Sequence, residues 1–238
     1  MSRMRAAPSP SRLCALLLAA LLCAPLSAQI VRRPPAEATA AARLAFPSPS
    51  PIRDGDGVRW TFRNHQLIET SFGPVLISEG RADGRDMAHA TSGRLDVTYF
   101  SRVGGALSVR RRFPNAVTVG SFGAIGEWSL SGRFTSMPVI YASGGFTGQG
   151  ITEGCTILTE IAPSGPRTIA TIPDVYNSEG AGRPPIEDVT GRIGDIVRDR
   201  QFTVRYTGTA RQVRRYVRRG AIFERQGSPV LTHCGAEQ

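Results

Sequence analysis

Leu95-Asp96-Val97-Thr98-Tyr99 and Phe202-Thr203-Val204-Arg205-Tyr206 are the two stretches that decide the fold class. In both, apolar and polar side chains alternate with a period of two, which is the period of a β-strand; an amphipathic helix repeats its apolar residues every 3.6 positions. The same period recurs around Leu107 and Val117, and again where Trp128, Leu130 and Phe134 are expected to share a core face. One-sided alternation is typical of antiparallel sheets, because parallel sheets are usually apolar on both faces.

Short turn signals separate these runs. Gly104-Gly105 stands between two of them and supplies the positive φ angles of a tight hairpin. Pro114-Asn115 and Asp83-Gly84 are predicted to be turns as well. Sequential strands with short connections pair with their neighbours. We therefore predict a mainly antiparallel all-β fold, a sandwich or a barrel-like meander with at most one or two short helices.

Three segments depart from this pattern. Ser143–Gly154 is rich in glycine and Asp174–Pro185 is rich in polar residues and proline, so both are expected to be surface loops. The segment Thr209–Gly220 is predicted to be a helix, because Val213, Tyr216 and Val217 have the spacing i, i+3, i+4. A basic strand is the alternative, since Val213, Arg215 and Val217 also alternate.

The N-terminus has the three parts of a secretory signal peptide. Arginines precede the apolar run Leu13–Ala24, and small residues lead to a cleavage position near Ala28. The run has twelve residues, whereas a membrane-spanning helix needs about 20. We expect residues 1–28 to be removed, which leaves a periplasmic or secreted protein without a transmembrane anchor. Residues 29–57 are expected to be a Pro- and Ala-rich flexible leader with a short helix at Ala36–Leu44, and residues 58–238 a single β-rich domain.

The chain is basic, and every basic residue is arginine. It contains 29 Lys or Arg, none of them Lys, against 19 acidic residues, for a net charge of +10. This usage is typical of a high-GC bacterial genome. The alternative is selection for the planar, bidentate contacts that arginine makes with carboxylates and phosphates.

Cys155 and Cys234 are the two cysteines that remain after signal cleavage. Two thiols in an oxidising compartment usually pair, so we predict a disulfide between them. Two buried free thiols are the alternative.

A cluster of arginines near the C-terminus is the strongest local feature: Arg211, Arg214, Arg215, Arg218 and Arg219. It predicts an anion-binding site for lipid head groups, lipopolysaccharide phosphates or acidic polysaccharides. The alternative is a solvated face paired with Asp195, Asp199 and Glu224. Nucleic acid is not an expected partner of an exported protein.

The sequence contains no catalytic, cofactor or metal motif that would assign a reaction. The glycines near Gly148 miss the dinucleotide spacing, the three histidines are far apart, and there is no GxSxG elbow. No cofactor or metal site is predicted, and catalytic residues stay unassigned.

These observations favour a non-catalytic envelope binding or structural protein whose partner is an anionic envelope component or another protein. A secreted hydrolase acting on a polysaccharide or ester is the alternative, and it requires a cleft lined by two carboxylates or a Ser–His pair. A protein that crosses the outer membrane with its strands is a weaker option, because aromatic residues make up only 7% of the chain.

Overall fold

The computed structural model describes residues 30–48, 52–53, 57–84, 88–232 and 234. These residues form two antiparallel sheets and one α-helix, so the predicted all-β antiparallel class is confirmed, in a sandwich-like form. The predicted signal peptide, residues 1–28, lies outside the described residues. Within the described part of the chain, no helix is long and apolar enough to cross a membrane.

The strands follow the chain from neighbour to neighbour, as a meander. The first sheet has the order β1-β3-β4-β5-β6, and β2 also pairs with β3. Its strands are β1 (Val31–Arg32), β2 (Ile52–Arg53), β3 (Arg59–Thr70), β4 (Gly73–Ala82), β5 (Gly93–Val103) and β6 (Ala106–Val119). The second sheet has the order β14-β13-β12-β11-β10-β9-β8-β7. Its strands are β7 (Glu127–Ser131), β8 (Val139–Gly148), β9 (Ile151–Ala162), β10 (Gly165–Asn177), β11 (Asp188–Val197), β12 (Gln201–Gly208), β13 (Gln212–Arg219) and β14 (Ile222–Arg225).

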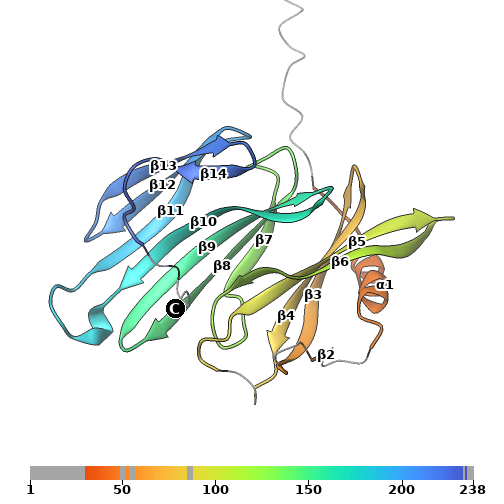
Figure 1. The fold of residues 1–238 in the computed structure, drawn as a ribbon, viewed down its shortest axis with the longest axis horizontal. Coiled ribbons are helices and arrows are strands. Elements are labelled where there is room, and N and C mark those ends of the chain that lie inside the picture. Colours follow the sequence, from red (N-terminus) through yellow and green to blue (C-terminus); the bar gives the residue numbers. More distant parts are fainter. Residues whose placement is uncertain (1–29, 49–51, 54–56, 85–87, 233, 235–238) are drawn as a thin grey trace, which may run out of the picture.

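The second sheet folds back on itself and thereby forms two layers. Strands β10 and β11 pair only through Val175–Asn177, after which β11 leaves β10, and β14 returns to contact β10. Figure 1 shows the resulting order of β3–β6, β7–β10 and β11–β14 across the molecule. One core lies between β3–β6 and β7–β10, and a second lies on the other side of β7–β10.

Strand β9 is therefore buried on both faces. Cys155 and Ile161 belong to the first core, and Leu158 belongs to the second. The polar residues Thr156 and Glu160 are buried as well. The expected alternation is confirmed on β12, whose Phe202, Val204 and Tyr206 all enter the second core.

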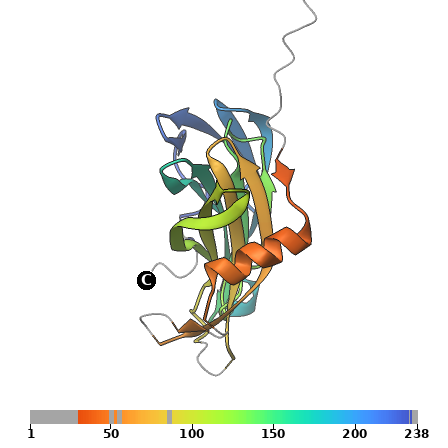
Figure 2. The same cartoon turned by 90° about the vertical axis from the view of Figure 1, so that its right-hand side faces the viewer.

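The helix α1 (Pro35–Ala45) confirms the helix expected at Ala36–Leu44. Pro35 begins it, a position where the missing N–H costs nothing. Its buried face consists of alanines, namely Ala38, Ala41, Ala42 and Ala45. These small side chains let the helix pack closely on Leu67, Leu76 and Phe100, so this segment forms a third core. Figure 2 shows α1 lying across the strands of the first sheet.

Two turn predictions have opposite outcomes. Gly104-Gly105 joins β5 to β6 with φ angles of +58° and +85°, which confirms the tight hairpin. Pro114-Asn115 is not a turn, because it lies inside β6, where the register to β5 shifts. Asn115 has a φ of +53°, and its backbone N–H donates to Asp96 Oδ1 at 3.0 Å. Proline and asparagine are also common in turns, so the local sequence Pro114-Asn115 does not distinguish this β-bulge from a turn.

The remaining expectations require three corrections. Ser143–Gly154 is not a surface loop but a hairpin of β8 and β9 around Gln149-Gly150. Asp174–Pro185 is a loop only after β10 ends at Asn177, and it contains a short 3-10 helix, Glu179–Ala181. Phe134 does not share a face with Trp128 and Leu130, because it lies beyond β7 and enters the second core.

The predicted disulfide between Cys155 and Cys234 is present, with a Cα–Cα distance of 5.1 Å. Cys155 is buried in the first core, and Cys234 packs against the same core. The bond therefore ties the end of the chain to the central strand β9, across 79 residues of sequence.

Candidate ligand-binding site

The predicted arginine cluster lies on a strand, β13, and not on a helix. Strand β13 pairs along its length with β12 and also pairs with β14, so backbone bonding to two neighbours overrides the helical spacing of its apolar residues. Because side chains alternate across a strand, the cluster is divided between two faces. Arg214 and Arg218 point to the same side as the buried Tyr216, whereas Arg215 and Arg219 are exposed on the opposite side. Arg211 is exposed just before β13.

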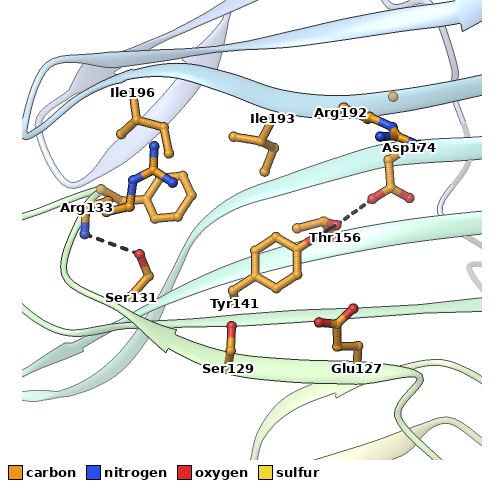
Figure 3. Close-up of a pocket in the computed structure, with 12 residues that line it drawn as sticks. Glu127, Ser129, Ser131, Arg133, Tyr141, Thr156, Asp174, Arg192, Ile193 and Ile196 are labelled. Carbon is orange, nitrogen blue, oxygen red and sulfur yellow. Dashed lines mark hydrogen bonds between the residues drawn. The ribbon is translucent and has the colours of Figure 1, made fainter.

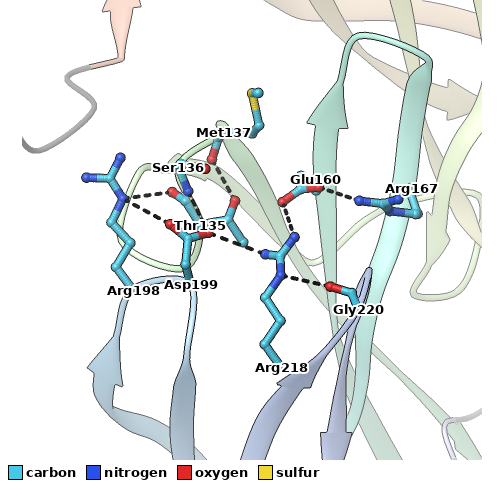
Figure 4. Close-up of polar contacts among 9 residues, drawn as sticks. All are labelled: Thr135, Ser136, Met137, Glu160, Arg167, Arg198, Asp199, Arg218 and Gly220. Atoms are coloured by element: carbon cyan, nitrogen blue, oxygen red, sulfur yellow. Dashed lines mark hydrogen bonds and ion pairs between the residues drawn. The ribbon is translucent and has the colours of Figure 1, made fainter.

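The inward arginines have structural partners. Arg218 donates from Nη2 to Glu160 Oε2 at 3.1 Å, and its Nη1 lies 3.6 Å from Asp199 Oδ1 (Figure 4). Glu160 also accepts from Arg167 Nη2 at 2.6 Å. Arg214 donates from Nε to the Ser228 carbonyl at 2.7 Å and bonds to Gln212. Arg218 therefore links β13 to β9 across the second core, whereas the guanidinium of Arg214 is occupied by local partners.

Charge balance at Glu160 explains how a buried carboxylate is tolerated. Burial raises its pKa, but hydrogen bonds from Thr135 and Arg167 and the positive charge of Arg218 outweigh that effect. The pKa of Glu160 accordingly lies below its ordinary value, and the side chain is ionised at neutral pH.

The outward side of β11–β13 carries a different arginine group, which we name the Arg face. In the ladder Arg192 lies directly opposite Arg205, Arg205 opposite Val213, and Thr203 opposite Arg215. The Arg face comprises the exposed residues Arg192, Arg205, Arg211, Arg215 and Arg219. Among the residues that the structure describes, none of these five side chains makes an ion pair or a hydrogen bond. Acidic residues lie on this side as well: Glu224 is opposite Val217, Asp195 Oδ2 accepts from Thr203 Oγ1 at 2.8 Å, and Asp188 precedes Arg192 on the same face of β11.

A groove of about 410 Å³ lies beside the Arg face, between β7–β10 and β11. Figure 3 shows its two sides: Glu127, Ser129 and Ser131 project from β7, and Ile193 and Ile196 face them from β11. Tyr141, Thr156 and Asp174 form its floor, and Phe134, Arg133, Arg192 and Gly191 complete the lining. Arg192 thus belongs to both the groove and the Arg face.

The floor of the groove is a chain of hydrogen bonds. Thr156 Oγ1 lies 2.5 Å from Asp174 Oδ2 and 3.2 Å from the Tyr141 hydroxyl. A threonine hydroxyl has one hydrogen, and Thr156 donates it to the closer partner, Asp174, so the Tyr141 hydroxyl is the donor to Thr156. Burial raises the pKa of Asp174 above its ordinary value, although the bond from Thr156 lowers it in part.

A larger cavity of about 580 Å³ lies between the end of α1 and strands β5 and β6. The charged groups in its wall already have partners. Arg94 Nε lies 3.3 Å from Asp96 Oδ1, its guanidinium stacks 4.4 Å from the Trp60 ring, and Arg112 Nη2 donates to the Leu44 carbonyl at 3.0 Å. The groove is therefore the better candidate, because its polar groups face open space.

The sequence did not point to the groove or to Arg192 and Arg205. In the sequence these residues are recognisable only as polar residues at alternate positions, and every strand with one face toward water has that pattern. In the described ranges there is no group of three or more His, Cys, Asp or Glu residues that could hold a metal ion. Comparisons with protein-family models, with curated proteins and with solved structures found no match to this chain.

Proposed function

We propose that this is an exported binding protein that attaches to a polyanionic component of the cell envelope through the Arg face. The observation that carries the proposal is the direct opposition of Arg192 and Arg205 across β11 and β12. Like charges directly opposite each other destabilise a sheet. An anion bound between them removes that repulsion, and so supplies a reason for the arrangement.

The chemistry of the Arg face suits carboxylate, phosphate or sulfate groups. A guanidinium binds such groups through two parallel N–H donors, and arginine is more weakly hydrated than lysine. Each exposed contact contributes little alone. Five unpaired guanidinium groups on one face bind a repeating anion by acting together, and they attract it from a distance.

The compartment supports the same proposal. The N-terminal residues have the pattern of a secretory signal, and the Cys155–Cys234 disulfide suits an oxidising compartment outside the cytoplasm. Polyanions at an exported protein's destination are phosphorylated lipids and acidic polysaccharides.

The test is a comparison of charge-removing variants that differ only in location. Arg205→Gln/Arg215→Gln removes two charges from the Arg face, and Arg81→Gln combined with Arg183→Gln removes two exposed arginine charges elsewhere. Binding of fluorescent polygalacturonate is measured at low salt. We expect the Arg-face pair to weaken binding at least tenfold more than the control pair. Equal effects of the two pairs would contradict the proposal.

A hydrolase is the second candidate, favoured by one observation: the groove is lined by two carboxylates, Glu127 and Asp174. Burial raises the pKa of Asp174, as a general acid requires. The test is release of new reducing ends from polygalacturonate, with Asp174→Asn and Glu127→Gln as the inactivating variants. Absence of product from the wild-type protein, at a concentration that saturates binding, counts against this candidate for that substrate.

A further inference from the structure

We propose that the groove between β7 and β11 binds sugar units, so that the polyanion held by the Arg face is an acidic polysaccharide. This inference rests on the proposed function and narrows its ligand class. A polyphosphate or an anionic lipid surface needs only the Arg face. A polysaccharide also needs a place for its hydroxyl groups and ring faces, and the groove supplies one.

The floor of the groove is built to accept hydrogen bonds. Thr156 Oγ1 lies within hydrogen-bond distance of both Asp174 Oδ2 and the Tyr141 hydroxyl. Thr156 has one hydrogen, and we infer that it is donated to the closer Asp174, so that the Tyr141 hydroxyl donates to Thr156. The oxygen of Tyr141 is left as an acceptor, beside the carboxylate of Asp174. Hydroxyl groups are the donors that match this floor, whereas phosphate and carboxylate oxygens are acceptors and do not.

The sides of the groove divide into a polar and an apolar wall. Glu127, Ser129 and Ser131 alternate along β7 and present a carboxylate and two hydroxyls on one side (Figure 3). Ile193 and Ile196 face them from β11. A sugar ring has the same division, because its hydroxyls lie around the edge and its C–H groups form apolar faces. The volume of about 410 Å³ is within the range of small-ligand pockets.

Arg192 connects the two surfaces. It lines the groove, and it lies opposite Arg205 in the ladder of the Arg face. A ligand that occupies both surfaces therefore carries hydroxylated rings and anionic groups along one chain. Polyuronates and other acidic polysaccharides have this structure.

The experiment compares two polyanions of matched charge, polygalacturonate and inorganic polyphosphate. The groove variant is Tyr141→Phe, which removes one hydroxyl and keeps the ring. Its matched control is Tyr176→Phe on β10, a tyrosine that does not line the groove. Arg205→Gln reports on the Arg face. Affinities for both polymers are measured for all four proteins by titration calorimetry at one low salt concentration.

We expect Tyr141→Phe to weaken binding of polygalacturonate about fivefold, the size of one hydrogen bond, and to leave polyphosphate binding unchanged. Tyr176→Phe should change neither affinity, and Arg205→Gln should weaken both. If Arg205→Gln weakens binding of both polymers while Tyr141→Phe changes neither affinity, the inference is overturned and the proposed function stands. If neither polymer binds the wild-type protein, both are overturned.

Discussion

Arg218 on β13 donates to Glu160 on β9 at 3.1 Å and thereby joins the outer layer to the central layer across the second core. Both side chains are largely buried, with exposed fractions of 18% and 4%. Arg218, one of the five arginines of the predicted anion-binding cluster, is thus a structural residue. This contact also explains why a carboxylate can stand in the middle of the fold.

Replacing Arg218 by Ala should destabilise the protein by about 2 kcal/mol. Glu160 would keep Arg167 but lose a charged partner in a buried position, and broken buried pairs cost more than exposed ones. Urea denaturation measures the free energy of unfolding. Arg215→Ala is the matched control, because Arg215 is exposed on the same strand; it should change that free energy by less than about 0.5 kcal/mol. Equal losses for the two variants would show that Glu160 does not need Arg218.

Asp174 should make the stability of the wild-type protein rise as the pH falls, relative to Asp174→Asn. Its pKa in the folded protein lies above the ordinary value of 3.8, because burial disfavours the charged form. The folded state then binds the proton more tightly than the unfolded state, so stability is gained below the folded pKa and lost as the pH rises through it.

The measurement for Asp174 is the difference in unfolding free energy between wild type and Asp174→Asn, from pH 3 to pH 8. We expect the difference to move in favour of the wild type between the raised pKa and about pH 3.8. A difference that moves in favour of Asp174→Asn as the pH falls would show that the hydrogen bond from Thr156 outweighs burial.

Removing the disulfide should cost about 4 kcal/mol of stability. The bond spans 79 residues, and closing so long a loop restricts the unfolded chain strongly. The variant is Cys155→Ala/Cys234→Ala, and guanidinium denaturation gives the change. The wild-type protein measured with a reducing agent serves as the control and should approach the double variant. If the double variant and the reduced wild-type protein each lose less than about 1 kcal/mol, the disulfide does not stabilise the fold as expected.

Several parts of the fold could be predicted because their causes are local. The alternation of Phe202, Val204 and Tyr206 identified β12. Gly104-Gly105 identified the β5–β6 hairpin through the φ angles that only glycine adopts easily. Cys155 and Cys234 were the two thiols left after the signal. For the strand and the hairpin the neighbouring residues alone contain the physical reason, and for the disulfide the count of two thiols left one possible pair.

Other parts depend on neighbours that are distant in sequence. Strand β9 is buried on both faces only because β11–β14 fold back over it, and nothing near Glu160 indicates this. The spacing of Val213, Tyr216 and Val217 fits a helix and a strand equally, and pairing with β12 and β14 decides between them. The groove escaped prediction for the same reason, since Glu127 and Ile193 meet only through the folded layers.

The salt dependence of polyphosphate binding tests the Arg face most directly. When a protein binds a polyanion and releases its counterions, the logarithm of the binding constant falls linearly with the logarithm of the salt concentration. The slope is roughly −0.7 for each charge contact on a flexible strand. Five arginines predict a slope of about −3.5 for the wild type and about −2 for Arg205→Gln/Arg215→Gln. A slope near zero, or one that the double variant leaves unchanged, would contradict a polyanion held by Arg192, Arg205 and Arg215.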